Sequence, residues 1–218
     1  MSNERERTNL LKRAEAAAIQ FLCAHMPRWV YPDLLTAIGF GGGLVVCAGL
    51  WLARRGERMF LLLAILGLAI HWFGDSLDGR LAYYRNTPRK WYGWALDINV
   101  DWTSACFIGL GFYFYLPSFK IVAFVFVVAY GGAMVVALLR YRITDKYAID
   151  TFKFGPTELR LVLAFVMLAE IYRPNTLLQF GFAGSVILIL INAIDSYKVL
   201  QLANQKDREE KAAKQNSV

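Results

Sequence analysis

Six long apolar runs, separated by short stretches that contain proline or clustered charges, constrain this chain more than any other feature. Each run approaches the roughly 20 residues that a helix needs to cross a bilayer, and the fifth is the shortest. With 57% hydrophobic and 19% charged residues, the chain is too apolar for a soluble domain or for disorder. The sequence predicts an all-α integral membrane bundle of six transmembrane helices, over residues 33–53, 59–82, 94–116, 119–139, 158–171 and 176–201.

The segment before the first apolar run has a different pattern. Apolar residues recur there at helical spacing between charged ones, over about residues 4–26. This pattern predicts an amphipathic helix on the membrane surface. Its expected apolar face consists of Leu10, Leu11, Ala14, Ala17, Ala18, Phe21 and Leu22. We therefore divide the chain into a surface helix (1–30), a six-helix transmembrane domain (31–202) and a charged, solvated tail (203–218).

The basic residues predict the orientation of the bundle. All but five of the 24 Lys and Arg residues fall on the side of the N-terminus, and positively charged loops face the cytoplasm. Both termini are thus expected to be cytoplasmic. The net charge of +7 is explained by topology, so we expect no nucleic-acid partner. The five exceptions are Arg54, Arg55, Arg58, Lys120 and Arg173.

Four aspartates interrupt the second and third apolar runs. An aspartate near the centre of a membrane helix costs about 2.5–3.5 kcal/mol on insertion, so such residues need a function or a partner. Asp75 and Asp78 are three residues apart, and Asp97 and Asp101 are four apart, so each pair shares one helix face. Hard oxygen ligands suit Mg²⁺ or Mn²⁺, and a pair of ions would fit four carboxylates. The alternative is that these are interfacial aspartates without a shared site.

The same residues resemble the signature of the CDP-alcohol phosphotransferase family, D-x2-D-G-x2-A-R followed by G-x3-D-x3-D. Seven of its eight fixed positions match, namely Asp75, Asp78, Gly79, Ala82, Gly93, Asp97 and Asp101. The sequence Pro32-Asp33-Leu34-Leu35-Thr36 also resembles the start of the first span in this family.

The resemblance implies an enzyme of phospholipid synthesis that moves a substituted phosphoryl group from a CDP-linked donor, expected to be CDP-diacylglycerol, to an alcohol hydroxyl. CMP is released. It implies that Asp75, Asp78, Asp97 and Asp101 bind the metal and that Asp101 is the general base. It also implies that the nucleotide lies against Thr36, Gly79, Ala82 and Gly93. Family members often form homodimers, which the residues themselves neither require nor exclude.

Two signature positions depart from the family pattern. The expected arginine is Tyr83, and the histidine that many relatives have after the third aspartate is Ile98. Arg80 or Arg85 is close enough in sequence to replace the missing charge, and we include Arg85 among the nucleotide-binding candidates. The departures leave open a relative that binds nucleotide or lipid without turnover. A small ion transporter that uses the membrane aspartates is the alternative outside the family.

Further candidate residues for substrate binding lie before and within the fifth apolar run. Arginine binds phosphate through two parallel hydrogen bonds, so a phosphorylated acceptor is one interpretation of these residues, and a topology signal is the other. Relatives carry a similar G-P-T-E-x-R segment at 155–160. The acceptor candidates are Arg140, Arg142, Glu158 and Arg160. His71, four residues before Asp75, is expected to be a buried, hydrogen-bonded histidine.

Overall fold

The computed structural model describes residues 12–116, 118–144 and 155–215, and these residues form seven α-helices and one short 3-10 helix, η1. The predicted all-α fold is confirmed. The elements are α1 (Lys12–His25), α2 (Pro32–Arg55), η1 (Arg58–Phe60), α3 (Leu61–Tyr84), α4 (Lys90–Tyr115), α5 (Lys120–Thr144), α6 (Pro156–Tyr172) and α7 (Thr176–Gln215).

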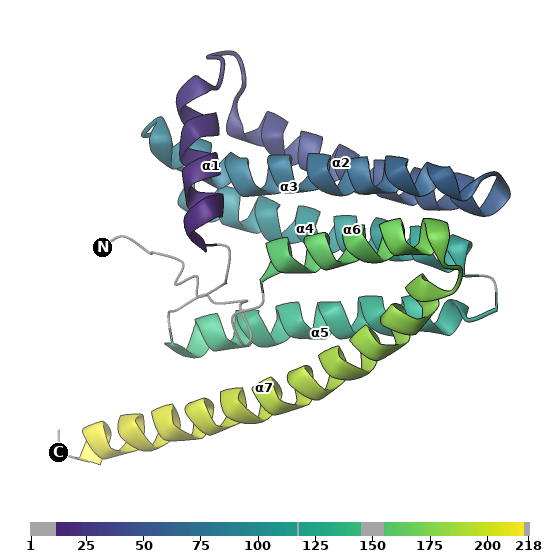
Figure 1. Cartoon of the computed structure of the whole chain (residues 1–218). Helices are drawn as coiled ribbons and strands as arrows, with labels where there is room; N and C mark the ends of the chain where they lie inside the picture. Colours follow the sequence, from purple (N-terminus) through teal and green to yellow (C-terminus); the bar gives the residue numbers. More distant parts are fainter. Residues whose placement is uncertain (1–11, 117, 145–154, 216–218) are drawn as a thin grey trace.

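The helices α2 to α6 lie side by side along one direction, and α1 crosses one end of them (Figure 1). The helix α7 packs on α5 and then extends beyond the bundle at the end where α1 lies. A core of buried apolar side chains joins the helices at the other end, with Leu50, Leu61, Phe112, Met167 and Leu177 among its members. The predicted tail begins inside α7, which continues as an exposed helix to Gln215.

Four helical segments in the described chain are long and apolar enough to cross a membrane: α2, η1 with α3, α5 and α7. The helices α4 and α6 are not among them. The helix α6 has only 17 residues, and α4 carries Asp97 and Asp101 in its first half. The structure thus supports an integral membrane protein, while the count of six spans stays a prediction. Exposed Phe124 and Val128 on α5 and Phe180 and Ile187 on α7 suit contact with lipid.

Glycines allow α2 and α3 to approach until their backbones touch. A Cβ atom on Gly74 would lie 2.2 Å from the nitrogen of Gly39 and 2.4 Å from the carbonyl oxygen of Leu35. A Cβ atom on Gly42 would lie 2.4 Å from the nitrogen of His71. Small residues at helix interfaces permit this approach in membranes. These glycines therefore fix the spacing of two walls of the pocket described below.

Substituting Gly74 tests this close packing. We expect Gly74→Ala to lower the free energy of unfolding by about 1–3 kcal/mol or more, because backbone atoms have to move to admit the methyl group. Gly41→Ala is the matched control, since its Cβ would meet no described residue within 4 Å and alanine favours a helix by up to about 1 kcal/mol over glycine. The measurement is the thermal unfolding midpoint of the purified protein in detergent. Equal midpoints for the two variants would contradict the packing.

The surface helix α1 packs on α3 through Ile19 and Cys23, which the expected apolar face did not include, together with Leu22, which it did. Ile19 and Cys23 are buried against Leu77 and Leu81 of α3. Phe21, which belongs to the predicted apolar face, is 62% exposed. The part of the prediction that concerns residues 1–11 lies outside the described residues. In the described part, α1 uses one face for the bundle and leaves apolar residues on another for the membrane surface.

Candidate active site

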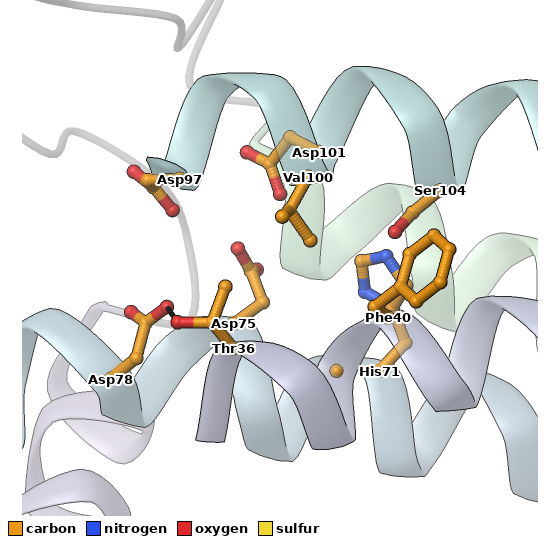
Figure 2. A pocket seen from close by; sticks show the side chains of 10 residues that line it. Thr36, Phe40, His71, Asp75, Asp78, Asp97, Val100, Asp101 and Ser104 are labelled. Atoms are coloured by element: carbon orange, nitrogen blue, oxygen red, sulfur yellow. Dashed lines mark hydrogen bonds between the residues drawn. The ribbon is translucent and has the colours of Figure 1, made fainter. Parts of the chain in front are cut away.

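A pocket lies between α2, α3 and α4. All four predicted aspartates and Thr36 line it, together with residues that the sequence analysis did not assign to the site (Figure 2). The lining residues are Thr36, Gly39 and Phe40 from α2, His71, Asp75 and Asp78 from α3, and Asp97, Val100, Asp101 and Ser104 from α4.

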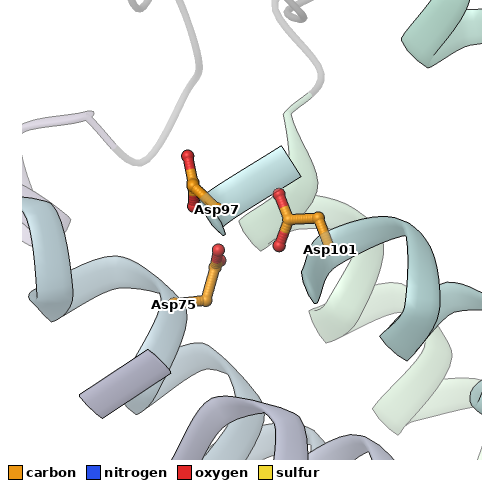
Figure 3. Close-up of side chains that lie close together, drawn as sticks. All are labelled: Asp75, Asp97 and Asp101. Atoms are coloured by element: carbon orange, nitrogen blue, oxygen red, sulfur yellow. The ribbon is translucent and has the colours of Figure 1, made fainter. Parts of the chain in front are cut away.

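Three carboxylates converge in this pocket. Asp75, Asp97 and Asp101 each offer an oxygen, and these atoms lie within 4.8 Å of one another (Figure 3). The four-residue spacing puts Asp97 and Asp101 on one face of α4, and that face looks toward Asp75 on α3. Carboxylate oxygens bind Mg²⁺ at about 2.0–2.1 Å and Ca²⁺ at 2.3–2.6 Å, so oxygens up to about 4–5 Å apart can share one ion. The donor set and its spacing fit a divalent cation.

Asp78 lines the same pocket but does not belong to this trio. Its Oδ2 accepts a hydrogen bond of 2.6 Å from the hydroxyl of Thr36, and its Oδ1 accepts one of 2.5 Å from the backbone nitrogen of Gly79. The bond from Thr36 attaches α2 to α3 beside the cluster, and the bond from Gly79 lies within α3. The four aspartates were expected to share one site, and all four line this pocket, with three of them close together and Asp78 next to them.

Arg160 reaches the cluster from α6. Its guanidinium donates a hydrogen bond of 2.6 Å to Asp75 Oδ2, and both side chains are largely buried. The start of α6 explains this placement: Pro156 occupies the first turn, and Glu158 accepts a hydrogen bond of 3.1 Å from the nitrogen of Gly155. This arrangement begins the helix at a defined residue. Arg160 is thus the acceptor candidate that the structure brings to the carboxylates.

Hydrogen bonds between residues far apart in the sequence connect the elements that surround the site. Thr157 donates a hydrogen bond of 2.9 Å to Glu15, which connects the start of α6 to the surface helix. The Arg85 guanidinium donates hydrogen bonds to backbone carbonyls in the connection between α1 and α2, namely those of Met26, Pro27 and Val30. Arg85 therefore braces a connection here, and its nucleotide contact stays a prediction.

The other predicted residues lie at varying distances from the pocket. The guanidinium of Arg140 is 3.5 Å from Asp195 of α7, Arg142 is exposed, and neither lines the pocket. A Cβ atom on Gly79 or Gly93 would meet nothing within 4 Å among the described residues, so space beside both glycines is open to a ligand. Ala82 is buried, with 9% of its surface exposed.

Two further residues line the pocket. Ser104 was not singled out in the sequence, whereas His71, four residues before Asp75, was noted there and expected to be buried and hydrogen-bonded. Both are buried, and His71 Nδ1 and Ser104 Oγ have no hydrogen-bond partner within the described part of the chain. Their positions carry a signal that helical spacing could have revealed. His71 precedes Asp75 by four residues and Ser104 follows Asp101 by three, so each shares a face with an aspartate.

Clustered carboxylates in a pocket with candidate membrane spans for two of its walls define a class of protein, the integral membrane proteins that can hold a divalent cation. Within this class, the family model for CDP-alcohol phosphatidyltransferase matches residues 29–194, and the chain belongs to that family. Its members are metal-dependent transferases of phospholipid synthesis that use a CDP-alcohol and an alcohol acceptor. No curated protein sequence is significantly similar to the chain.

Proposed function

We propose that this enzyme transfers the phosphatidyl group of CDP-diacylglycerol to a hydroxyl of a small alcohol and releases CMP. Membership of the family supports the reaction class. The pocket supports a lipid donor, because two of its walls, α2 and α3, are candidate membrane spans. A diacylglycerol moiety can then remain in the bilayer while its diphosphate reaches the carboxylates.

The carboxylate trio is the observation that carries this proposal. Asp75, Asp97 and Asp101 would hold Mg²⁺ or Mn²⁺, with Asp78 beside them available to a second ion. Bound there, the cation supplies neutralisation of the negative charge on the diphosphate. The positive charge of Arg160, next to Asp75, adds to this neutralisation. Its guanidinium is suited to bind a phosphate group of the donor or of the acceptor.

Asp101 is the proposed general base. The oxygen of the acceptor hydroxyl attacks the phosphorus distal to cytidine, and the bond from that phosphorus to the bridging oxygen of the diphosphate breaks. The electron pair leaves with CMP, and the hydroxyl proton passes to the Asp101 carboxylate. The position of Asp101 in the pocket, within reach of the other two carboxylates, supports this role, since a base has to lie within hydrogen-bond distance of the proton that it removes.

The remaining predicted contacts complete the proposal. Thr36 holds Asp78 by a hydrogen bond, and the open space beside Gly79 and Gly93 lets a nucleotide approach the backbone. We keep the cytoplasm as the side of the active site and of both termini, since α1 and the C-terminal end of α7 lie at the same end of the bundle (Figure 1). The full set of proposed nucleotide contacts is Thr36, Gly79, Ala82, Arg85 and Gly93, and that of acceptor contacts is Arg140, Arg142, Glu158 and Arg160.

The test is CMP release by the purified protein in mixed micelles. We expect release with CDP-diacylglycerol and an alcohol acceptor, and little with CDP-choline or CDP-ethanolamine. Cytidine-nucleotide binding without release would instead identify a relative that has lost turnover. Cation flux through protein-loaded liposomes, with no nucleotide binding, would identify a transporter. Release from CDP-choline in place of CDP-diacylglycerol would overturn the donor assignment.

A further inference from the structure

The first turn of the surface helix α1 carries a buried carboxylate that the proposed chemistry does not use. Glu15 is 6% exposed, whereas the residues that follow it, Ala16 and Ala17, are exposed. Acidic side chains are almost never fully buried without a partner, because burial removes the water that solvates their charge. A helix at a membrane surface can instead turn an acidic residue toward water. The burial of Glu15 therefore indicates a specific contact.

This contact is made with the first turn of α6, which begins at the end of the bundle that α1 crosses (Figure 1). Thr157 Oγ1 donates a hydrogen bond of 2.9 Å to Glu15 Oε1. The bond from the Gly155 nitrogen to Glu158 shapes the same turn, but it joins residues of one segment and does not fix where the turn lies. The bond to Glu15 attaches the turn to another helix, and hydrogen bonds to a charged acceptor are the stronger ones.

The helix α1 is itself held against α3, so it can act as a fixed support. Ile19 and Cys23 are buried against apolar side chains of α3. At the end of α3, the Arg85 guanidinium donates hydrogen bonds to backbone carbonyls of the connection that follows α1. The Glu15 carboxylate thus has a defined position relative to α3, the helix that carries Asp75.

The same turn of α6 directs Arg160 to the carboxylates. Arg160 follows Thr157 by three residues, so the two side chains lie on one face of α6. The Arg160 guanidinium donates a hydrogen bond of 2.6 Å to Asp75 Oδ2, and the two side chains are only 15% and 19% exposed. Residues three apart belong to one hydrogen-bonded helical turn, so a displacement of Thr157 carries Arg160 with it.

We propose that Glu15 is a positioning residue of the transfer reaction. Through its hydrogen bond to Thr157 it fixes the start of α6, and so it places the Arg160 guanidinium against Asp75. This inference rests on the proposed function, in which Arg160 binds a phosphate group of a substrate. Glu15 does not line the pocket and acts only through α6. The surface helix thereby takes part in the reaction, a role that its apolar pattern does not indicate.

The test removes the hydrogen bond and then restores it with conservative variants. We expect Glu15→Ala to lower kcat/KM for CMP release by about tenfold, within the roughly 100-fold that a displacement of about 1 Å can cost an enzyme. Thr157→Val, which loses the donor, should have a similar effect. Glu15→Gln keeps an acceptor oxygen and Thr157→Ser keeps a hydroxyl donor, so both should stay within about threefold of the wild type. Activity lost equally in Glu15→Ala and Glu15→Gln would contradict a role through this bond.

A second background separates positioning from stability alone. In Arg160→Gln the guanidinium is absent, so adding Glu15→Ala should change kcat/KM by less than about twofold, since residues that act through one another are not additive. Equal fold losses in the wild-type and Arg160→Gln backgrounds would overturn the proposal and show that the bond only stabilises the fold. If Arg160→Gln releases no measurable CMP, Arg160→Lys replaces it with the same expectation, because lysine lacks the paired hydrogen bonds of arginine.

Gln20→Ala is the matched control on α1. Gln20 is exposed on the same helix, so this variant should keep the kcat/KM of the wild type. A loss in Gln20→Ala as large as that in Glu15→Ala would show that α1 tolerates no substitution and would remove the specific role of Glu15.

A measurement without turnover separates this proposal from the proposed function. If the wild-type protein releases no CMP with any acceptor, the proposed function fails, and amide hydrogen exchange of the full protein in detergent then tests the positioning. The Leu159 amide bonds to the carbonyl of Gly155 at the start of α6. We expect faster exchange there and at Arg160 in Glu15→Ala, but not in Glu15→Gln or Gln20→Ala. Unchanged exchange in Glu15→Ala would overturn the proposal.

Discussion

Asp101→Asn is expected to lower the rate of transfer by about 100- to 10,000-fold, the contribution that a positioned general base makes. Asparagine has nearly the same shape as aspartate and retains a carbonyl oxygen, but it cannot take the proton from the attacking hydroxyl. The side chain lies in the pocket with Asp75 and Asp97, so the change leaves the nucleotide contacts in place. Binding of CDP-diacylglycerol should therefore survive. The measurements are CMP release at saturating substrate and nucleotide-dependent thermal stabilisation.

Asp33→Asn is the control for this substitution. Asp33 forms an ion pair with Arg89 and does not line the pocket, and an ion pair as exposed as this one contributes about 0–1 kcal/mol. We expect near wild-type turnover in this variant. Full activity in Asp101→Asn would remove the base assignment, and loss of nucleotide binding in the same variant would show that Asp101 acts mainly in holding the substrate complex.

The carboxylate trio was predictable because helix periodicity is a local rule. The spacing of Asp97 and Asp101 fixes their common face before any tertiary contact is known, and the cost of an unpaired aspartate in a membrane makes convergence with Asp75 the favourable arrangement. The spacing of Asp75 and Asp78 fixes their common face in the same way. In each of these cases the sequence separation that matters is a few residues.

The partners of these groups were not predictable in the same way. The bonds from Thr36 to Asp78, from Arg160 to Asp75 and from Thr157 to Glu15 join residues that are 42, 85 and 142 positions apart. Such contacts depend on how the helices pack, which many side chains decide together. The basic residues show what sequence cannot predict. Their charge alone placed Arg140 and Arg160 in one group, whereas in the packed bundle Arg140 lies beside Asp195 and Arg160 lies at the site.

Periodicity does not tell which apolar surroundings a side chain meets where a helix has two. In α1 the expected apolar face was assigned to the membrane surface, and Ala17, Ala18 and Phe21 of that face are exposed, while Ile19 and Cys23 pack against α3. A hydrophobic pattern does not distinguish lipid from protein, since both accept apolar side chains. The apolar pattern of α4 is ambiguous too. Whether this helix crosses the membrane depends on which groups offset the cost of placing its aspartates there.

Removal of divalent cations is expected to abolish transfer. Without a cation, the carboxylates of Asp75, Asp97 and Asp101 face the diphosphate as like charges, and the single positive charge of Arg160, bonded to Asp75, does not balance them. We expect a chelator to reduce CMP release by more than about 100-fold, in line with the loss of several kcal/mol of charge stabilisation. Added Mg²⁺ or Mn²⁺ should restore it. The measurement is CMP release after exhaustive chelation and metal replacement.

The dependence on metal concentration then distinguishes the roles of the aspartates. Changing an outer partner of a metal ligand weakens metal binding by about 10- to 100-fold, so loss of a ligand in Asp97→Asn should raise the half-saturating concentration of Mg²⁺ at least as much. Asp78 already accepts bonds from Thr36 and Gly79. If Asp78→Asn raises that concentration equally, Asp78 holds an ion despite these bonds. If it lowers turnover without changing the metal requirement, Asp78 serves to position α2 against α3. Chelator-resistant turnover in the wild type would contradict the metal site altogether.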